Sequence, residues 1–249
     1  MDADVTQILS RPGEFVDPWE SDVPLWESGA RNRLSATVDR LAGPIADLEE
    51  RDANEGDTRF LVTDFLSDGL GYSKYEDLTT EYRTKGESVD YGLKIGDSVF
   101  ALVEVKRAAQ NLDARNLRQV RLSAENEGVQ WLVLTNGRVW QVHHLAEGAA
   151  GTELVLEVDL LGDAEKAEKL DGLFHLSKAA VEHGRLENLR KWREALTGAP
   201  LAAAVCSEAV VEAVRAEVRR RTGHTGHAGD VEDVLRGLRE EVVAKGLLD

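Results

Sequence analysis

The sequence has almost no sulfur, with one cysteine, Cys206, and one methionine in 249 residues. A single cysteine excludes an internal disulfide and a zinc site built from cysteines, and it fits a reducing compartment. The absence of a run of about 18 apolar residues argues against a transmembrane helix. The opening residues, MDADVTQILSRPGEF, also lack the basic and apolar regions of a signal peptide. We therefore expect a soluble cytoplasmic protein without a membrane partner.

Positive charge is also scarce, since 30 lysines and arginines stand against 46 aspartates and glutamates, for a formal charge of -16. Nucleic-acid-binding proteins usually present a basic surface, so this total favours a protein partner. A local cluster can still steer DNA toward a site. The candidate DNA-binding residues are Arg107, Arg115, Arg118 and Arg121. A solvated helix face balanced by nearby glutamates is the alternative interpretation of these arginines. The preference for arginine over lysine fits a GC-rich genome or a salt-tolerant host.

The central feature of the sequence is a predicted β-hairpin over residues 89–107, VDYGLKIGDSVFALVEVKR. Polarity alternates along both arms, and Gly96-Asp97 between them is a turn signal. The odd-numbered residues from Val89 to Ile95 and from Val99 to Val105 are the predicted core face. Pairing the two apolar faces requires Ile95 opposite Val99 across a three-residue loop, or a bulge that restores this register.

The opposite face of the hairpin carries Asp90 on one strand and Glu104 with Lys106 on the other. In the expected register Asp90 lies across from Glu104, so two carboxylates stand about 5 Å apart and repel unless a cation lies between them. Their hard oxygen atoms suit Mg²⁺ or Mn²⁺. Lys106 could orient a metal-bound water or stabilise charge on a phosphate, which is the chemistry of phosphodiester hydrolysis.

These residues resemble the PD-(D/E)xK nuclease superfamily, and more narrowly the N-terminal nuclease domain of type I restriction R proteins and its stand-alone relatives. The resemblance covers residues 53–145, through NEGDTRFLVTDFLSDGLGY, the hairpin, the helix around Gln119 and WLVLTNGRVWQVHHL. It implies metal ligands at Asp90, Glu104 and Glu55, and catalytic roles for Lys106, Gln119 and Glu55. Ser123 stands where the family motif that begins at Gln119 has tyrosine. On the residues alone, Glu55 could simply be an acidic residue favoured by the helix dipole.

The resemblance implies an α/β fold, with a restriction-endonuclease-like mixed β-sheet flanked by helices. It also implies a Mg²⁺- or Mn²⁺-dependent endonuclease that cuts DNA in restriction or defence. An RNA-directed hydrolase with the same site, and a catalytically silent module that binds a protein or nucleic acid, are the alternatives. The chain contains no GxxxxGK[ST] loop, so a motor ATPase would have to be a separate subunit, as would a modification subunit. A homodimer is a further possibility.

Three regions are predicted along the chain. Residues 1–52 form an N-terminal arm and a helix that Gly43-Pro44 should kink or divide. Residues 53–161 form the nuclease-like core, beginning with a helix from Asn54 to Leu70 whose predicted buried stripe includes Phe60 and ending with a strand over 153–161. Residues 162–249 form a helical C-terminal region, expected to be a small bundle or lid.

Overall fold

A computed structural model describes residues 23–84, 88–146, 151–226 and 229–243. These residues contain one open, mixed sheet whose six strands lie in sequence order. The strands are β1 (Leu78–Arg83), β2 (Ser88–Ile95), β3 (Ser98–Val105), β4 (Trp131–Thr135), β5 (Val139–Leu145) and β6 (Thr152–Asp159). Neighbouring strands are antiparallel except β3 and β4, which are parallel. The parallel pair requires a crossover, and α3 (Ala114–Glu127) provides it. The expected α/β class with helices beside a mixed sheet is confirmed.

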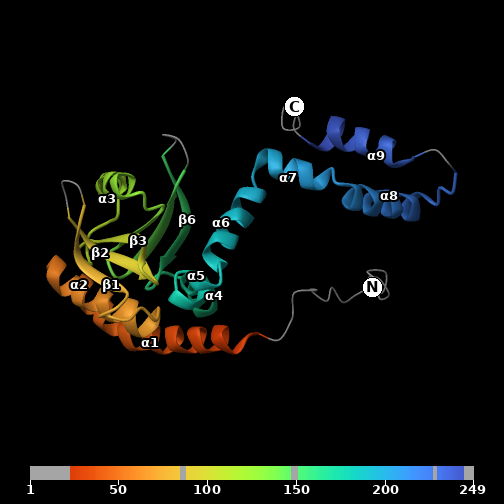
Figure 1. Cartoon of the computed structure of the whole chain (residues 1–249). Coiled ribbons are helices and arrows are strands. Elements are labelled where there is room, and N and C mark those ends of the chain that lie inside the picture. The colour runs from red at the N-terminus through yellow and green to blue at the C-terminus, as the bar shows by residue number, and fades with distance from the viewer. Residues whose placement is uncertain (1–22, 85–87, 147–150, 227–228, 244–249) are drawn as a thin grey trace.

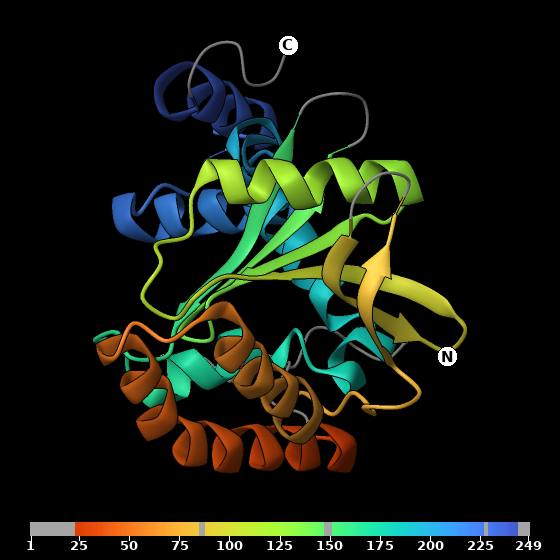
Figure 2. The same cartoon turned by 90° about the vertical axis from the view of Figure 1, so that its left-hand side faces the viewer.

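Helices cover both faces of the sheet (Figures 1 and 2). Helix α3 lies on one face and packs on a small cluster around Leu102, Val120 and Leu132. The other face carries α1 (Leu25–Glu50), α2 (Glu55–Asp64) and the π-helical turn η2 (Phe65–Gly69). Their apolar side chains meet those of the sheet in the main core, where the ring centroids of Phe65 and Trp140 lie 4.8 Å apart. Strands buried on both faces, such as β4, are therefore apolar throughout.

Helix α1 is continuous, so the predicted division at Gly43-Pro44 is wrong. Pro44 removes one backbone donor but lies on the exposed side, where its ring meets solvent. Leu41, Ile45 and Leu48 hold the inner face of the same turns in the core. Burial of this face therefore outweighs the local cost of the proline.

Helix α2 begins as predicted, with the Asn54 side chain accepting a hydrogen bond from the Asp57 N–H at 2.9 Å. Leu61, Phe65 and Leu66 are buried, as expected for the inner stripe. Phe60 is not, because its side chain is 78% exposed. The helical period placed Phe60 at the margin of the stripe, and the neighbouring elements do not extend far enough to cover it.

The β2–β3 turn is tighter than the expected three-residue loop. Ile95 pairs with Ser98 rather than with Val99, so only Gly96 and Asp97 form the turn. The register then shifts beside Leu93, which pairs with Ala101. This bulge, the second of the two expected solutions, returns odd-numbered residues to face odd-numbered residues toward the far end of the hairpin.

The predicted core face of the hairpin is correct only in part. Tyr91, Ala101 and Val103 belong to the main core, whereas Val89 and Val99 pack into the cluster under α3. For Val99 the bulge is the cause. For Val89 the cause lies at Glu81 on the neighbouring strand, a non-glycine residue with φ +48° in the left-handed region. At this point β1 and β2 both turn, so that the side chains beyond it, Tyr82 and Val89, lie on the α3 side of the sheet.

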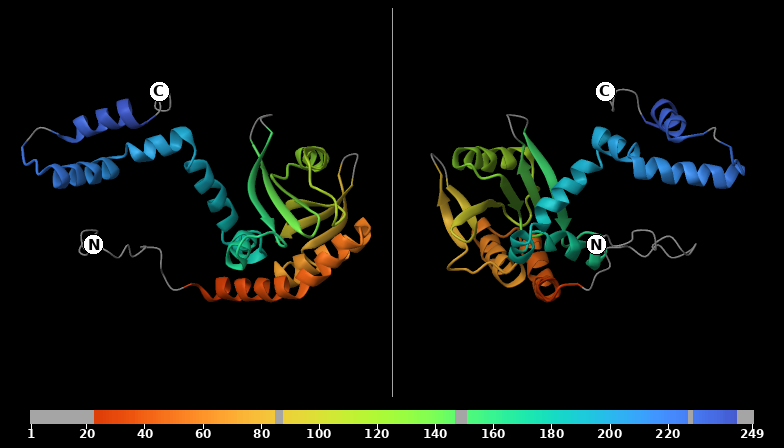
Figure 3. Two further views of the ribbon diagram at one scale, coloured as in Figure 1. Left: turned by 180° about the vertical axis from the view of Figure 1, so that it is seen from behind. Right: turned by 45° about the vertical axis from the view of Figure 1, so that its right-hand side comes forward.

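The C-terminal helices divide into two groups. Helices α4 (Lys166–Phe174) and α5 (Lys178–Glu182) pack against α1, and α4 also contacts β6. Leu173, Phe174, Leu176 and Ala180 join the main core. The remaining elements are α6 (Arg185–Ala195), α7 (Gly198–Val205), α8 (Glu208–Thr222), α9 (Val231–Gly237) and a final π-helical turn (Leu238–Val242). From α6 onward the chain extends away from the sheet, and α9 folds back along α8 (Figures 1 and 3). This arm is more extended than the expected bundle or lid.

Candidate active site

The candidate site lies where β2 and β3 stop pairing. Their last paired residues are Tyr91 and Val103. One residue further along, the Asp90 carboxylate takes the place of a strand carbonyl, since its Oδ2 accepts a hydrogen bond from the Val105 N–H at 2.7 Å. Asp90 therefore terminates the β2–β3 ladder with its side chain. The two strands diverge beyond it, which leaves room for charged groups.

Glu104 and Lys106 form a buried ion pair at this end of β3. The Lys106 Nζ lies 2.6 Å from the Glu104 Oε1, and the two side chains are 12% and 6% exposed. Burial raises the pKa of the Glu104 carboxyl; Lys106 opposes this shift, and the negative charges of Asp90 and Glu55 add to it. Burial alone would lower the pKa of Lys106, but Glu104, Glu55 and Asp90 together raise it above its ordinary value.

These mutual shifts show that Glu55, Asp90, Glu104 and Lys106 share one electrostatic environment. Glu55 comes from the first turn of α2, Asp90 from β2, and the other two residues from the end of β3. The structure joins Lys106 to Glu104 and binds the Asp90 carboxylate to the Val105 N–H between them, whereas Glu55 acts on Glu104 and Lys106 only through its charge. Burial, together with the negative charges of Asp90 and Glu55, disfavours the ionised form of Glu104.

Arg59, one residue before the exposed Phe60 on α2, also contacts the site and was not among the predicted residues. Its Nη1 lies 3.0 Å from the Asp90 Oδ1. The Tyr91 hydroxyl donates to the Arg59 carbonyl at 2.9 Å and lies 2.8 Å from the Thr63 hydroxyl, which ties α2 to β2. An arginine within a predicted helix carries no signal of a site in a single sequence. Its partner lies 31 positions away.

The turn after β4 holds the backbone of the segment that contains Lys106. The Thr135 carbonyl accepts a hydrogen bond from the Lys106 N–H at 2.8 Å. Next to it, buried Asn136 donates from Nδ2 to the carbonyls of Ala108 and Gln110, and accepts at Oδ1 from the N–H groups of Arg138 and Val139. The LTNG segment thus fixes the backbone that follows Lys106.

The predicted residues on α3 lie apart from this cluster. Gln119, Arg115 and Arg118 are exposed, and no hydrogen bond within the described residues joins them to Glu104 or Lys106. Arg121 lies 3.5 Å from Glu125 on its own helix. Arg107 is closer in sequence but pairs with Asp52 at 2.9 Å. Ser123, in place of the motif tyrosine, is buried and accepts a hydrogen bond from Thr84.

The donor chemistry of the cluster fits Mg²⁺ or Mn²⁺, because carboxylate oxygens are the ligands these ions prefer. The arrangement is not a preformed cage: in the part of the chain that the structure describes, no three histidine, cysteine, aspartate or glutamate side chains are grouped closely enough to hold a metal. Asp90 and Glu104 instead hold Arg59 and Lys106. A divalent cation would therefore compete with these two side chains for the same oxygens.

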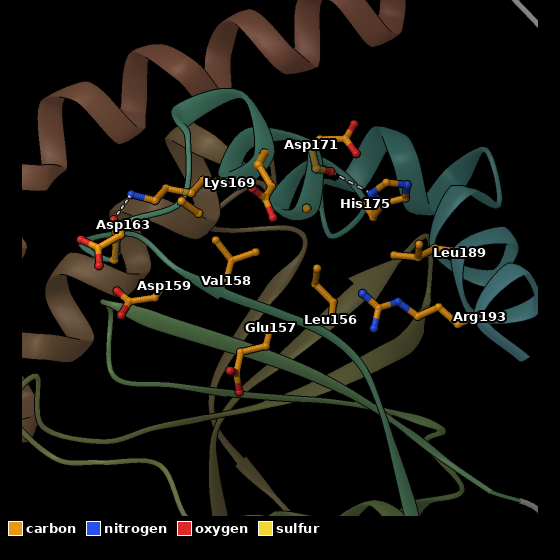
Figure 4. Close-up of a pocket in the computed structure, with 14 residues that line it drawn as sticks. Leu156, Glu157, Val158, Asp159, Asp163, Lys169, Asp171, His175, Leu189 and Arg193 are labelled. Carbon is orange, nitrogen blue, oxygen red and sulfur yellow. Dashed lines mark hydrogen bonds between the residues drawn. The ribbon is translucent and has the colours of Figure 1, made fainter. Parts of the chain in front are cut away.

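A second cavity, of about 330 Å³, lies between β6 and helices α4 and α6 (Figure 4). Its charged groups are largely engaged in holding the fold together. The Lys169 Nζ donates to the carbonyls of Leu160 and Gly162, and Asp159 forms a bidentate pair with Arg138. Arg193 reaches from α6 toward Leu156 on β6 (Figure 4). The Lys169 bonds fasten α4 to the segment that follows β6, the Asp159–Arg138 pair joins β6 to β5, and the cavity offers no reactive set.

The chain matches no protein-family model, no curated protein and no solved structure. Among the described residues, no helix combines the length and apolar character needed to cross a membrane.

Proposed function

We propose that this chain is a metal-dependent phosphodiesterase that cuts DNA, with a restriction-endonuclease-like fold and a role in restriction or defence. The observation that carries the proposal is the buried Glu104–Lys106 ion pair at the end of β3, with the Asp90 carboxylate bound to the Val105 N–H between these two residues and Glu55 on α2 adding negative charge. Like charges gathered in a buried place are costly for the fold. A divalent cation would relieve that cost, so the arrangement makes physical sense as a metal site.

Asp90 and Glu104, with Glu55 directly or through a water, would hold Mg²⁺ or Mn²⁺. The cation supplies a positive centre for the scissile phosphate and lowers the pKa of a bound water. Lys106 is protonated near neutral pH, because its pKa is raised by the surrounding carboxylates. It would therefore donate a hydrogen bond to the attacking water or the phosphate, offset developing negative charge, and leave proton removal to another group.

The acidic total of the chain does not conflict with this role. Lys106 and Arg59 place two cations within the site itself. Arg115 and Arg118 add exposed positive charge on α3. DNA would be the substrate and RNA the alternative. Gln119 keeps the supporting role implied by the resemblance, and a homodimer or a separate motor or modification subunit remains the expected context.

A catalytically silent binding module is the second candidate, and the full engagement of Asp90 favours it. Both carboxylate oxygens of this residue are used, by Arg59 and by the Val105 N–H. A site that had lost its metal would be expected to replace the missing cation with an internal one. The two functions differ in whether Mg²⁺ or Mn²⁺ can displace Arg59 from Asp90.

The test is cleavage of plasmid, linear and single-stranded DNA and of RNA by the purified protein, with Mg²⁺, Mn²⁺ or EDTA. We expect metal-dependent cutting of DNA that Asp90→Asn and Lys106→Ala each reduce by about 10³-fold or more, since the site acts as a unit. Asp97→Asn, in the exposed β2–β3 turn, is the matched control and should cut normally. The nuclease proposal fails if no substrate is cut and if Mn²⁺ raises the melting temperature of wild type no more than that of the Asp90→Asn variant. The binding module is then the better account.

A further inference from the structure

Phe60 is a large apolar residue in an exposed position on α2. The predicted buried stripe of α2 includes it, yet its ring is 78% exposed while Leu61 beside it is in the core. Single exposed apolar residues are common and need no explanation by themselves. Phe60 differs because it stands between two hollows, one between α2 and strands β1 and β2, the other between α1 and α2. Its ring is therefore a ridge that a ligand in either hollow would touch.

The hollow beside β1 and β2 borders the candidate metal site. It has a volume of about 240 Å³, and Asp90 and Tyr91 form part of its lining. Arg59 and Thr63 line it from α2, so that a guanidinium and a hydroxyl border the same hollow as the Phe60 ring. This volume is below the roughly 300–1,000 Å³ of sites that enclose a whole small molecule. It suits one unit of a longer chain that continues across the surface.

The backbone of β1 keeps this hollow open. Thr80 pairs with Tyr91 and Tyr82 pairs with Val89, so Glu81 lies between these pairs opposite Asp90. Glu81 has φ +48°, and beyond it Tyr82 packs on the α3 side of the sheet. The large ring of Tyr82 is thereby turned away. Only Thr80 and Glu81 of β1 line the hollow.

We propose that this hollow binds the nucleotide next to the scissile phosphate, with the Phe60 ring stacked on its base and Arg59 bound to its phosphate. The inference rests on the proposed nuclease function and extends it to substrate binding. Stacking on an aromatic ring is open to any base, and guanidinium groups suit phosphate oxygens. Asp90 would exchange Arg59 for the metal ion, and the released guanidinium would then be free to hold the DNA strand at the edge of the site.

A protein side chain could also dock on an exposed phenylalanine. Two observations favour a nucleotide. Arg59 places a cation beside the ring, where the anionic strand must pass to reach Lys106. The hollow also begins at Asp90, so a base stacked on Phe60 belongs to a nucleotide directly beside the proposed reaction centre.

The experiment uses DNA oligonucleotides with 2-aminopurine at successive positions, because stacking quenches its fluorescence. Full-length protein carrying Glu104→Gln binds these oligonucleotides in Mg²⁺ without cutting them. We expect quenching at one position, which Phe60→Ala abolishes together with an affinity loss of about tenfold or more, the size of one lost base stack. Phe60→Tyr should retain both effects. Trp192→Ala, which removes an aromatic residue that is 64% exposed on α6, is the matched control and should change neither.

The salt dependence of binding tests Arg59 separately. Arg59→Gln should lower the slope of log affinity against log salt by about one phosphate contact, whereas Phe60→Ala should leave the slope unchanged. Arg40→Gln removes a comparable surface arginine paired with Asp68 at 2.7 Å, and it should have no effect.

Normal affinity and quenching in Phe60→Ala would overturn the subsite, as would quenching with RNA but not DNA. Cleavage by wild type is scored independently. A protein that cuts DNA but ignores the loss of Phe60 has the proposed function without this subsite. A protein that cuts nothing, yet loses quenching with Phe60→Ala, lacks the proposed function and retains a nucleotide-binding hollow.

Discussion

Asp90 makes two structural contacts besides the proposed metal binding. Because of them, the Asp90→Ala and Asp90→Asn variants should differ in stability. Its Oδ2 accepts from the buried Val105 N–H, and its Oδ1 holds Arg59. Asp90→Ala leaves the Val105 N–H without an acceptor, which should cost about 1–3 kcal/mol. Asp90→Asn keeps one oxygen for this N–H and loses the charge and the oxygen that binds Arg59, so we expect a smaller change because the buried N–H stays paired. Chemical denaturation of both variants in EDTA measures the difference, and equal stabilities would contradict this account of the ladder end.

Glu104 predicts a pH dependence in the absence of divalent cations. Burial raises the pKa of its carboxyl in the folded state, so the folded protein binds this proton more tightly than the unfolded chain. The resulting stability is fully present below the ordinary pKa of 4.5 and is lost as the pH rises through the raised value. Glu104→Gln imitates the protonated form. It should therefore be more stable than wild type near pH 7 in EDTA and lose this advantage below pH 4.5.

Thermal melting in EDTA from pH 4 to pH 8 checks that difference. Gln130→Ala, exposed just before β4, serves as a control at an uncharged surface position. A Glu104→Gln variant that is less stable than wild type at every pH would mean that the bond to Lys106 outweighs the burial of the carboxylate.

At the scale of elements, the turn after β4 is the part on which the site depends most. Asn136 satisfies two backbone carbonyls and two N–H groups, and it is buried. Asn136→Ala leaves these groups without partners, and we expect a loss of about 2–4 kcal/mol. Because the carbonyls belong to Ala108 and Gln110, cleavage should also fall through displacement of Lys106. Gln130→Ala, exposed at the start of β4, is the control, and equal melting of both variants would contradict the prediction.

The elements themselves could largely be predicted from local sequence. The apolar run at 129–134 predicts a strand buried on both faces, and β4 is such a strand. Asn54 before an apolar helical period predicts the start of α2, and its side chain caps that helix. Signals of this kind are contained in the residues that form the element. The alternation of charges on the hairpin likewise placed Asp90, Glu104 and Lys106 near one another.

What could not be predicted depends on distant residues. Val89 changes face because Glu81, on another strand, adopts a left-handed conformation. Phe60 is exposed because no element among the described residues covers the edge of α2, and a helical period contains no information about the extent of neighbouring elements. The Arg59–Asp90 pair joins α2 to β2 and leaves no trace in either segment. Arg59, with which a metal ion would compete for Asp90, could therefore not be predicted as a site residue from the sequence.

At the scale of the whole molecule, the chain consists of a body and an arm. The body includes α4 and α5 as well as the sheet, because their apolar residues share a core with α1 and Trp140. The outer part of the arm, from α7 onward, packs mainly on its own successive helices, as Figure 3 shows. The predicted boundary after residue 161 falls within the body by this criterion, and truncation can test it.

A chain ending after residue 161 lacks Leu173, Phe174 and Leu176, each at most 2% exposed in the full-length protein. Loss of each large buried side chain costs about 2–5 kcal/mol, so the three together rival the roughly 5–15 kcal/mol that hold an ordinary domain folded. We expect this fragment to be insoluble or to melt without cooperativity. A chain ending after residue 197 retains all three residues and Leu186, and removes only the outer arm. It should melt within about 2 °C of full length and retain its cleavage activity. Thermal melting by circular dichroism decides, with full-length protein as the control. Cooperative melting of the shorter fragment at the full-length temperature would show that the core folds without α4 and α5 and is complete at residue 161.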